Sequence, residues 1–203
     1  MKGLPLRVAA LLASVLAACA GTDVGNPPGS SPGPFAVVTL RFTGSAPTGQ
    51  GLTLASGHTV DDAWVVVDRI RLRTTDACEG APSGPDDVPG PVAVELIGGT
   101  VLPATPTFEV AATAFCRLEI DLDPLTEGAI AGAPAELEGN SVMIRGSRRD
   151  GVRYIIRGAI DPRFELDARS MPFSLAEGDR ELVVRFDYES WVDAAQLDEA
   201  EID

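Results

Sequence analysis

Apolar and polar residues alternate with the two-residue period of β-strands through most of the chain after residue 34. Glycine and proline separate the alternating segments, and no core segment of ten residues has a strong helical repeat. The pattern predicts an all-β protein, an antiparallel β-sandwich of about nine or ten short strands with little helix. The segments concerned are 38–42, 52–54, 64–73, 92–97, 101–102, 108–110, 115–123, 142–160, 164–166, 171–175 and 181–188.

Two of these segments, 64–73 and 115–123, predict a strand pair. Residues 64–67 are apolar on both faces, and after Asp68 three arginines alternate with apolar residues. In 115–123 one face is apolar and includes Cys116, and the other is charged. We expect antiparallel pairing that aligns opposite charges on the solvent side, each pair contributing roughly 0.2–1 kcal/mol. The expected pairs are Arg73 with Glu119, Arg71 with Asp121, and Arg69 with Asp123.

The segment 142–160 predicts a hairpin. A two-residue loop at Asp150 and Gly151 would mix apolar and charged residues on one face. A three-residue loop, 149–151, places Gly151 where a type I turn with a bulge needs a left-handed residue. It also aligns four apolar residues on one face: Val142, Ile144, Tyr154 and Ile156.

The first 34 residues have a different composition. Lys2 and Arg7 precede an apolar run at 8–16, which has the length of a secretory leader and is too short to span a bilayer. Residues 20–34 are rich in glycine, proline and serine, a composition typical of a flexible spacer.

The four residues Leu16-Ala17-Ala18-Cys19 resemble the lipobox of bacterial lipoproteins. The resemblance implies that the leader is removed before Cys19 and that this cysteine carries fatty acyl chains, which anchor the protein in the lipid bilayer. Ala20 implies the outer membrane of a Gram-negative cell envelope, facing the periplasm or the surface. The alternative is an ordinary signal peptide with an incidental cysteine.

These features divide the chain into four parts. The leader occupies residues 1–18, the acylated cysteine and linker occupy 19–34, and one β-sandwich domain occupies 35–192. An acidic tail, 193–203, follows. After removal of the leader, 14 basic residues remain against 30 acidic ones, a net charge of −16. Such a charge argues against nucleic acid as a partner and leaves an unknown protein or glycan.

Cys78 and Cys116 remain after Cys19. In an exported protein an even pair indicates a disulfide, which here would contribute about 3–4 kcal/mol on the chain-entropy model. Two unpaired buried cysteines are the alternative. A metal site is disfavoured because His58 is the only histidine and no two cysteines are close in sequence.

Several carboxylates suggest calcium, but the chain has no Asp-x-Asp-x-Asp-Gly loop. A solvated charged face is the simpler interpretation of these residues: Asp61, Asp62, Asp86, Asp87, Glu119, Asp121 and Asp123. Asp68 lies at an inward position of its strand, where it is a catalytic candidate, a paired carboxylate, or a residue exposed by a bulge.

A hydrolase would need His58 with Asp61 or Asp62 and with Ser56 or Ser141. No Gly-x-Ser-x-Gly elbow supports this, and His58 is expected to be an exposed turn residue. We expect the four large aromatic residues to pack in the core rather than to form a sugar-stacking surface: Trp64, Tyr154, Tyr188 and Trp191.

Segments 62–70, 116–120 and 139–142 resemble uncharacterised bacterial surface lipoproteins that carry a β-sandwich domain. The resemblance implies a transthyretin-like or immunoglobulin-like sandwich and no catalytic residue or cofactor. We therefore expect a non-enzymatic binding or structural module, with recognition on loops such as 74–91. The alternatives are a carbohydrate- or calcium-dependent adhesive module and an envelope hydrolase.

Overall fold

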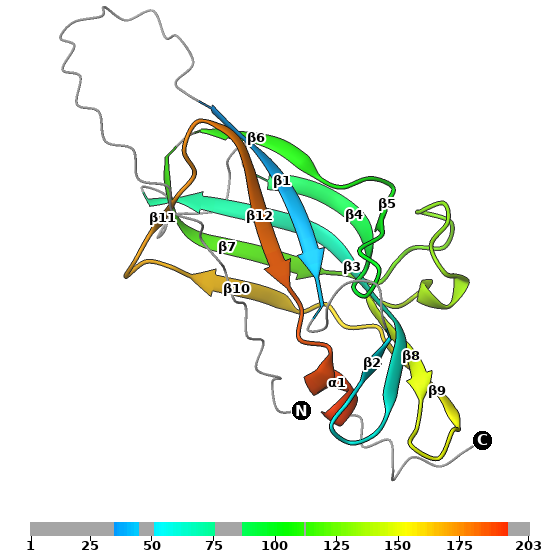
Figure 1. Cartoon of the computed structure of the whole chain (residues 1–203). Helices are drawn as coiled ribbons and strands as arrows, with labels where there is room; N and C mark the ends of the chain where they lie inside the picture. Colours follow the sequence, from blue (N-terminus) through cyan, green and yellow to red (C-terminus); the bar gives the residue numbers. More distant parts are fainter. Residues whose placement is uncertain (1–34, 45–50, 76–86, 112, 195–203) are drawn as a thin grey trace, which may run out of the picture.

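One long strand, β3 (Thr59–Thr74), runs through the larger of two sheets in this computed structural model (Figure 1). The first part of β3 pairs with β2 (Leu52–Thr53) and β8 (Val142–Ser147). Its later part pairs with β4 (Asp87–Glu95) and β7 (Ala114–Leu122). The structure describes residues 35–44, 51–75, 87–111 and 113–194.

Four further strands extend the large sheet. β5 (Val101–Leu102) pairs with β4, and β9 (Arg153–Gly158) pairs with β8. β10 (Arg163–Asp167) and β11 (Phe173–Ser174) both pair with β7. All pairs in this sheet are antiparallel, as the sequence predicts.

The small sheet has the order β12-β1-β6. β1 (Phe35–Thr43) pairs antiparallel with β6 (Thr107–Ala111) and parallel with β12 (Gly178–Arg185), although the sequence predicts antiparallel sheets. Helical structure in the described residues comprises α1 (Glu189–Ala194), the 3₁₀ turn Ala135–Leu137, and Thr75 directly after β3. The all-β prediction is confirmed, with twelve described strands rather than nine or ten.

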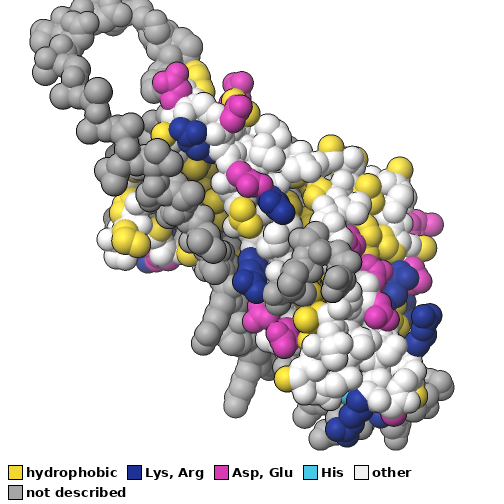
Figure 2. Space-filling model, in the orientation of Figure 1, with side chains coloured by type: hydrophobic (Ala, Val, Ile, Leu, Met, Phe, Trp, Pro, Cys, Tyr) yellow, Lys and Arg dark blue, Asp and Glu magenta, His cyan; other side chains and the backbone are white. Residues whose placement is uncertain are grey.

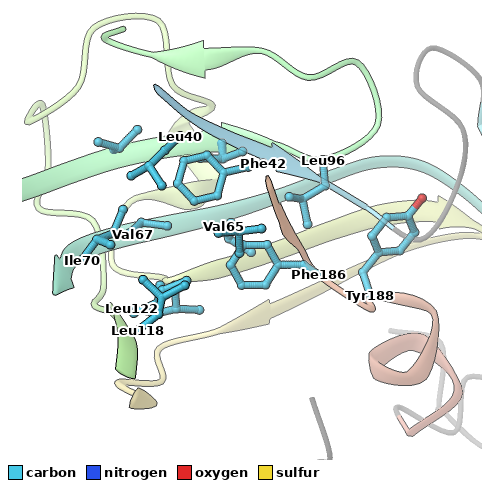
Figure 3. Packing of buried hydrophobic residues seen from close by; sticks show 14 of the residues in the cluster. Leu40, Phe42, Val65, Val67, Ile70, Leu96, Leu118, Leu122, Phe186 and Tyr188 are labelled. Carbon is cyan, nitrogen blue, oxygen red and sulfur yellow. The ribbon is translucent and has the colours of Figure 1, made fainter. Parts of the chain in front are cut away.

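The main core lies between the two sheets (Figure 3). Alternate residues of β1, such as Leu40 and Phe42, are buried and face buried residues of β3 and β7 in the large sheet. Phe186 stacks on Phe42 with ring centroids 6.4 Å apart, and Tyr188 is completely buried. Val184 is buried as well, so alternate residues of the segment 181–188 are buried, as its two-residue period predicts.

A β-bulge in β3 sets which residues reach the core. The registers with β4 and β7 both shift between Val67 and Arg69, which leaves Asp68 without a ladder partner. As a result Val65 and Val67 point into the core before the bulge, and Ile70 and Leu72 do so after it. The side chain of Asp68 is half-buried rather than fully buried. Of the three interpretations of this residue, a position exposed by a bulge is therefore confirmed.

The outer face of the large sheet, which points away from the small sheet, carries a second apolar cluster. Trp64 and Val66 of β3 and Met143 of β8 are buried there under the segment 124–140. From this segment Leu125, Ile130 and Leu137 cover the cluster. Residues 64–67 are therefore buried on both faces, as their composition predicts.

The predicted pairing of β3 with β7 is confirmed, but its register is wrong by two residues. Arg71 lies opposite Glu119, and Arg73 lies opposite Arg117. A second bulge then shifts the pairing by one more residue, because Thr74 lies opposite Phe115 and Cys116 is the extra residue. The Phe115 side chain, which buries more apolar area than a thiol, takes the core position expected for Cys116.

The hairpin prediction is confirmed. The Arg148 N–H donates to the carbonyl oxygen of Val152 at 2.7 Å, which closes a loop of three residues, 149–151. Gly151 has a φ of 83°, the left-handed conformation that this turn needs. The loop expected at 74–91 is shorter than its composition indicates, because β4 already begins at Asp87.

Candidate functional site

The β8–β9 hairpin differs in charge from the rest of the chain. Residues 145–157, which we name the arginine hairpin, contain five arginines and a single carboxylate, Asp150. The segment has a net charge of +4 in a chain whose formal net charge is −14. In Figure 2 arginine side chains lie along the lower right end of the molecule, where Figure 1 places β8 and β9.

Four of the five arginines of this hairpin fall into two groups. Arg145 pairs with Asp62 at 3.8 Å and with Glu136 at 3.1 Å, and Arg148 pairs with Asp150 at 3.1 Å. Arg153 and Arg157 are exposed on β9, and no carboxylate in the described part of the chain forms a salt bridge with either. These two guanidinium groups are available to a ligand.

Close packing holds the hairpin against β3. The Tyr154 hydroxyl donates to the Thr59 carbonyl oxygen at 2.8 Å, and the backbone of Gly146 lies next to both of these atoms. A Cβ atom at Gly146 would stand 1.8 Å from the Thr59 oxygen and 2.6 Å from the Tyr154 hydroxyl. Burial, with a smaller contribution from the negative charge of Asp61, raises the pKa of Tyr154 to about 12. Tyr154 is therefore a neutral anchor.

His58 also fixes the hairpin, and its predicted exposure is wrong. The side chain is only 4% exposed, and its Nδ1 accepts a hydrogen bond of 3.2 Å from the Arg149 N–H. The turn before β3 folds against the tip of the β8–β9 loop, a contact between residues 91 positions apart. Sequence patterns around His58 do not reveal such a long-range contact.

A pocket of about 230 Å³ opens beside the hairpin. Asp62 on its wall is partly buried, and this burial raises the pKa of its carboxyl group. The nearby Trp64 side chain and the positive charge of Arg145 lower this pKa and so act in the opposite direction. The lining combines two carboxylates, two guanidinium groups and one aromatic ring, and its residues are Asp61, Asp62, Arg145, Gly146, Arg153 and Tyr154. Such a wall can orient a small polar ligand.

A second hollow, of about 360 Å³, lies between β1 and the turn after β4. Arg41 and Glu181 on its rim form an exposed salt bridge of 3.7 Å. Its other polar side chains are threonines, Thr39, Thr43 and Thr105. Because the charged groups satisfy each other, this hollow offers weaker recognition than the pocket beside the hairpin.

The residues of the hydrolase hypothesis do not form a triad. Ser141 is completely buried. Its hydroxyl donates to the carbonyl oxygen of Ile160, lies 3.1 Å from that of Gly158, and accepts from the Ile160 N–H. Ser141 therefore fixes the end of β9 instead of acting as a nucleophile. Ser56 is exposed, and neither serine lines the pocket.

The prediction that the acidic residues form a solvated face is wrong for Glu119, which is only 6% exposed. Its carboxylate lies 3.3 Å from Arg71 and 3.7 Å from Arg73. Asp121 is 2.7 Å from Arg71, and Asp123 is exposed. In the residues that the structure describes, no group of three or more metal-ligating side chains occurs. Asp86 and the side chain of Asp87 lie outside the described part.

Of the three cysteines, Cys19 and Cys78 lie outside the described residues, so acylation and the disulfide stay predictions. Cys116 is buried at the second bulge, and its Sγ lies 3.3 Å from the Arg73 carbonyl oxygen and 3.2 Å from that of Thr74. The four large aromatic residues pack as expected: Trp64 and Tyr188 are buried, and Tyr154 and Trp191 contact the main core.

No protein-family model matches this sequence, and neither a curated protein nor a solved structure matches it. Among the described residues no helix is long and apolar enough to cross a membrane. The candidate site therefore rests on geometry and charge. In the sequence, the site is marked only by five arginines within thirteen residues. This pattern has neither the spacing of a catalytic motif nor that of a metal-binding motif.

Proposed function

We propose that this protein is an envelope lipoprotein, a β-sandwich binding module that Cys19 anchors in the outer membrane of a Gram-negative cell. The observation that carries the proposal is the sequence Leu16-Ala17-Ala18-Cys19 directly after a short apolar run. Each buried CH₂ group of an acyl chain contributes ~0.8 kcal/mol, so two or three chains hold a protein on a bilayer without a spanning helix.

The arrangement of the domain supports presentation away from the membrane. β1 begins at Phe35, and the linker 20–34 joins the anchor to this strand. In Figure 1 the start of β1 and the β8–β9 hairpin lie at opposite ends of the domain. A module tethered through β1 would hold the arginine hairpin on its far side, where a partner in the envelope can reach it.

The hydrogen bonds of Ser141 and His58 support binding rather than hydrolysis. Both side chains are buried and bond to the backbone of the hairpin. A hydrolase would need the serine exposed and within reach of the imidazole. We therefore assign a non-enzymatic role to the domain.

The proposal includes a disulfide between Cys78 and Cys116. Cys116 sits at the bulge opposite Thr74, and its Sγ approaches the backbone of β3 at the end of that strand. Cys78 follows Thr74 by only four positions in the sequence, so the chain after β3 is long enough to reach Cys116.

The anchor is tested by expressing the full chain and its Cys19→Ser variant in a Gram-negative host supplied with labelled palmitate. We expect label and membrane sedimentation for the parent chain and loss of both for the variant. Cys116→Ser is the matched control and should keep the label. A Cys19→Ser chain that still sediments with membranes would refute the proposal.

A carbohydrate-binding module is the second candidate, and the pocket beside the hairpin favours it. Its two carboxylates and two guanidinium groups can hydrogen-bond the hydroxyl groups of a sugar, and about 230 Å³ accommodates a single ring. Calorimetry with neutral and acidic monosaccharides tests this. Heat that disappears in Asp62→Asn would support the candidate, and no heat with any sugar would exclude it.

A further inference from the structure

We infer that the free edge of β9 binds an extended acidic peptide segment of a partner protein, which adds to the sheet as a further strand. The inference rests on the proposed role as a binding module and gives that role a partner of defined chemistry. In the bound state two carboxylates of the segment face Arg153 and Arg157, and an apolar residue between them faces Ile155.

The backbone of β9 presents unused hydrogen-bonding groups at this edge. In the described part of the chain, β9 pairs with β8 and with no other strand. The bond from Arg148 to Val152 fixes the alternation of the ladder, so the N–H and C=O groups of Tyr154 and Ile156 face β8. Those of Arg153, Ile155 and Arg157 therefore face the open side.

The same three residues also present their side chains to solvent. Arg153 and Arg157 are exposed, and Ile155 is 40% exposed. Ile155 is one of four large apolar residues that are exposed in the described part of the chain. Ile160, which is 47% exposed, lies just beyond the strand. Along this edge, alternate exposed side chains are basic, apolar and basic. A strand that carries acidic, apolar and acidic side chains at alternate positions would match them in charge and polarity.

Charge excludes a second copy of this chain as the occupant. In an antiparallel pair of β9 strands centred on Ile155, each Arg153 would lie opposite an Arg157. In an in-register parallel pair, each arginine would lie beside its own copy. Like charges directly opposite one another destabilise a strand pair, so the edge repels itself and attracts carboxylates.

Two other edge strands do not share this property. β10 carries Arg163, Glu165 and Asp167 at its exposed positions, and Arg163 pairs with Asp121 at 2.8 Å. β12 exposes both signs of charge, and its Glu181 pairs with Arg41. Charges at these edges are mixed and partly neutralised, whereas the exposed charges of β9 are of one sign.

The inference is tested with the full-length acylated protein in detergent micelles and a fluorescein-labelled peptide of sequence SETVTES. Fluorescence anisotropy should show saturable binding that weakens with salt. We expect the double variant Arg153→Glu/Arg157→Glu to lose at least tenfold in affinity and to gain affinity for the basic peptide SRTVTRS. Arg180→Glu, which changes an exposed arginine on the β12 edge, is the matched control and should bind like the parent.

A second experiment, with a peptide whose backbone is altered, distinguishes strand addition from simple charge attraction and needs no variant protein. The same acidic peptide with an N-methylated valine keeps its charge but lacks one edge hydrogen bond, and we expect its affinity to fall at least fivefold. Equal affinity of the two peptides would overturn the inference, as would equal loss in Arg180→Glu. Binding that appears only after residues 195–203 are deleted would assign the edge to the chain's own tail and overturn it too. Palmitate labelling reports the membrane anchor separately, so the two proposals fail independently.

Discussion

The outer face of the large sheet has two halves that bury their side chains by opposite means. In the first half Trp64, Val66 and Met143 form a purely apolar cluster under the segment 124–140. In the second half, on the same strand β3, Arg71 and Arg73 are 7% and 6% exposed and surround Glu119. One face of one strand thus changes from apolar to ionic within a few residues.

The two halves stabilise the fold differently. Apolar burial contributes roughly 25 cal/mol per Å² of area removed from water and depends little on orientation. A buried ion pair must first offset the desolvation of both charges, and it does so only while all partners remain. The ionic half therefore tolerates less change than the apolar half. It supplies strand register, because Arg71 contacts both Glu119 and Asp121 on β7.

The most damaging single change should be Glu119→Ala in the ionic half. It removes the carboxylate that lies within 3.7 Å of Arg71, Arg73 and Arg117, and removing one partner of a buried ion pair costs about 3–5 kcal/mol. Urea unfolding followed by circular dichroism measures the loss. Glu165→Gln, which breaks a partly exposed pair with Arg117, is the control and should cost at most about 1 kcal/mol. Equal losses in both variants would contradict a buried network.

In the apolar half, Leu137→Ala should cost about 2–4 kcal/mol, because this completely buried side chain leaves a cavity over the sheet. The loss should be independent of salt, whereas part of the Glu119 effect should change with ionic strength. Met171→Ala, at a side chain that is 80% exposed, should stay within about 0.5 kcal/mol of the parent. A Leu137→Ala loss as small as that of Met171→Ala would show that 124–140 does not seal the cluster.

The smallest effect is expected at Asp62, whose carboxyl group lies near the Trp64 side chain at the end of the apolar half. Burial raises its pKa in the folded protein above the ordinary 3.8. The folded state therefore binds this proton more tightly than the unfolded state, and the contribution of Asp62 to stability rises as the pH falls through its folded pKa. Carboxyl ¹³C titration should give a midpoint above 3.8, and Asp62→Asn should lose this part of the pH dependence. A midpoint at or below 3.8 would contradict the burial of this group.

Much of the fold was predictable from short stretches of sequence, because strands have a two-residue period of apolar and polar residues and tight turns require particular residues such as glycine. The β8–β9 loop and the left-handed Gly151 follow from two short alternating runs around Asp150 and Gly151. The double burial of 64–67 follows from four apolar residues in a row. These features depend on neighbours in the chain, and the sequence displays them directly.

The candidate site was predictable only in part. The arginine content of 145–157 is visible in the sequence. Its significance depends on two facts about the described residues: β9 pairs there with β8 alone, and no carboxylate forms a salt bridge with Arg153 or Arg157. The burial of His58 and Ser141 depends on contacts with residues 91 and 19 positions away, so no local pattern predicts their structural roles.

By itself the sequence determined the strand class, the hairpin loop and the acidic character of the chain, because alternation, glycine position and charge are properties of neighbouring residues. Tertiary structure decided the β3–β7 register, the parallel pairing of β1 with β12, and the burial of Glu119 among arginines. Each of these depends on which distant strands meet. The bulges at Asp68 and Cys116 show the physical reason: packing Ile70, Leu72 and Phe115 into one core outweighs an unbroken ladder.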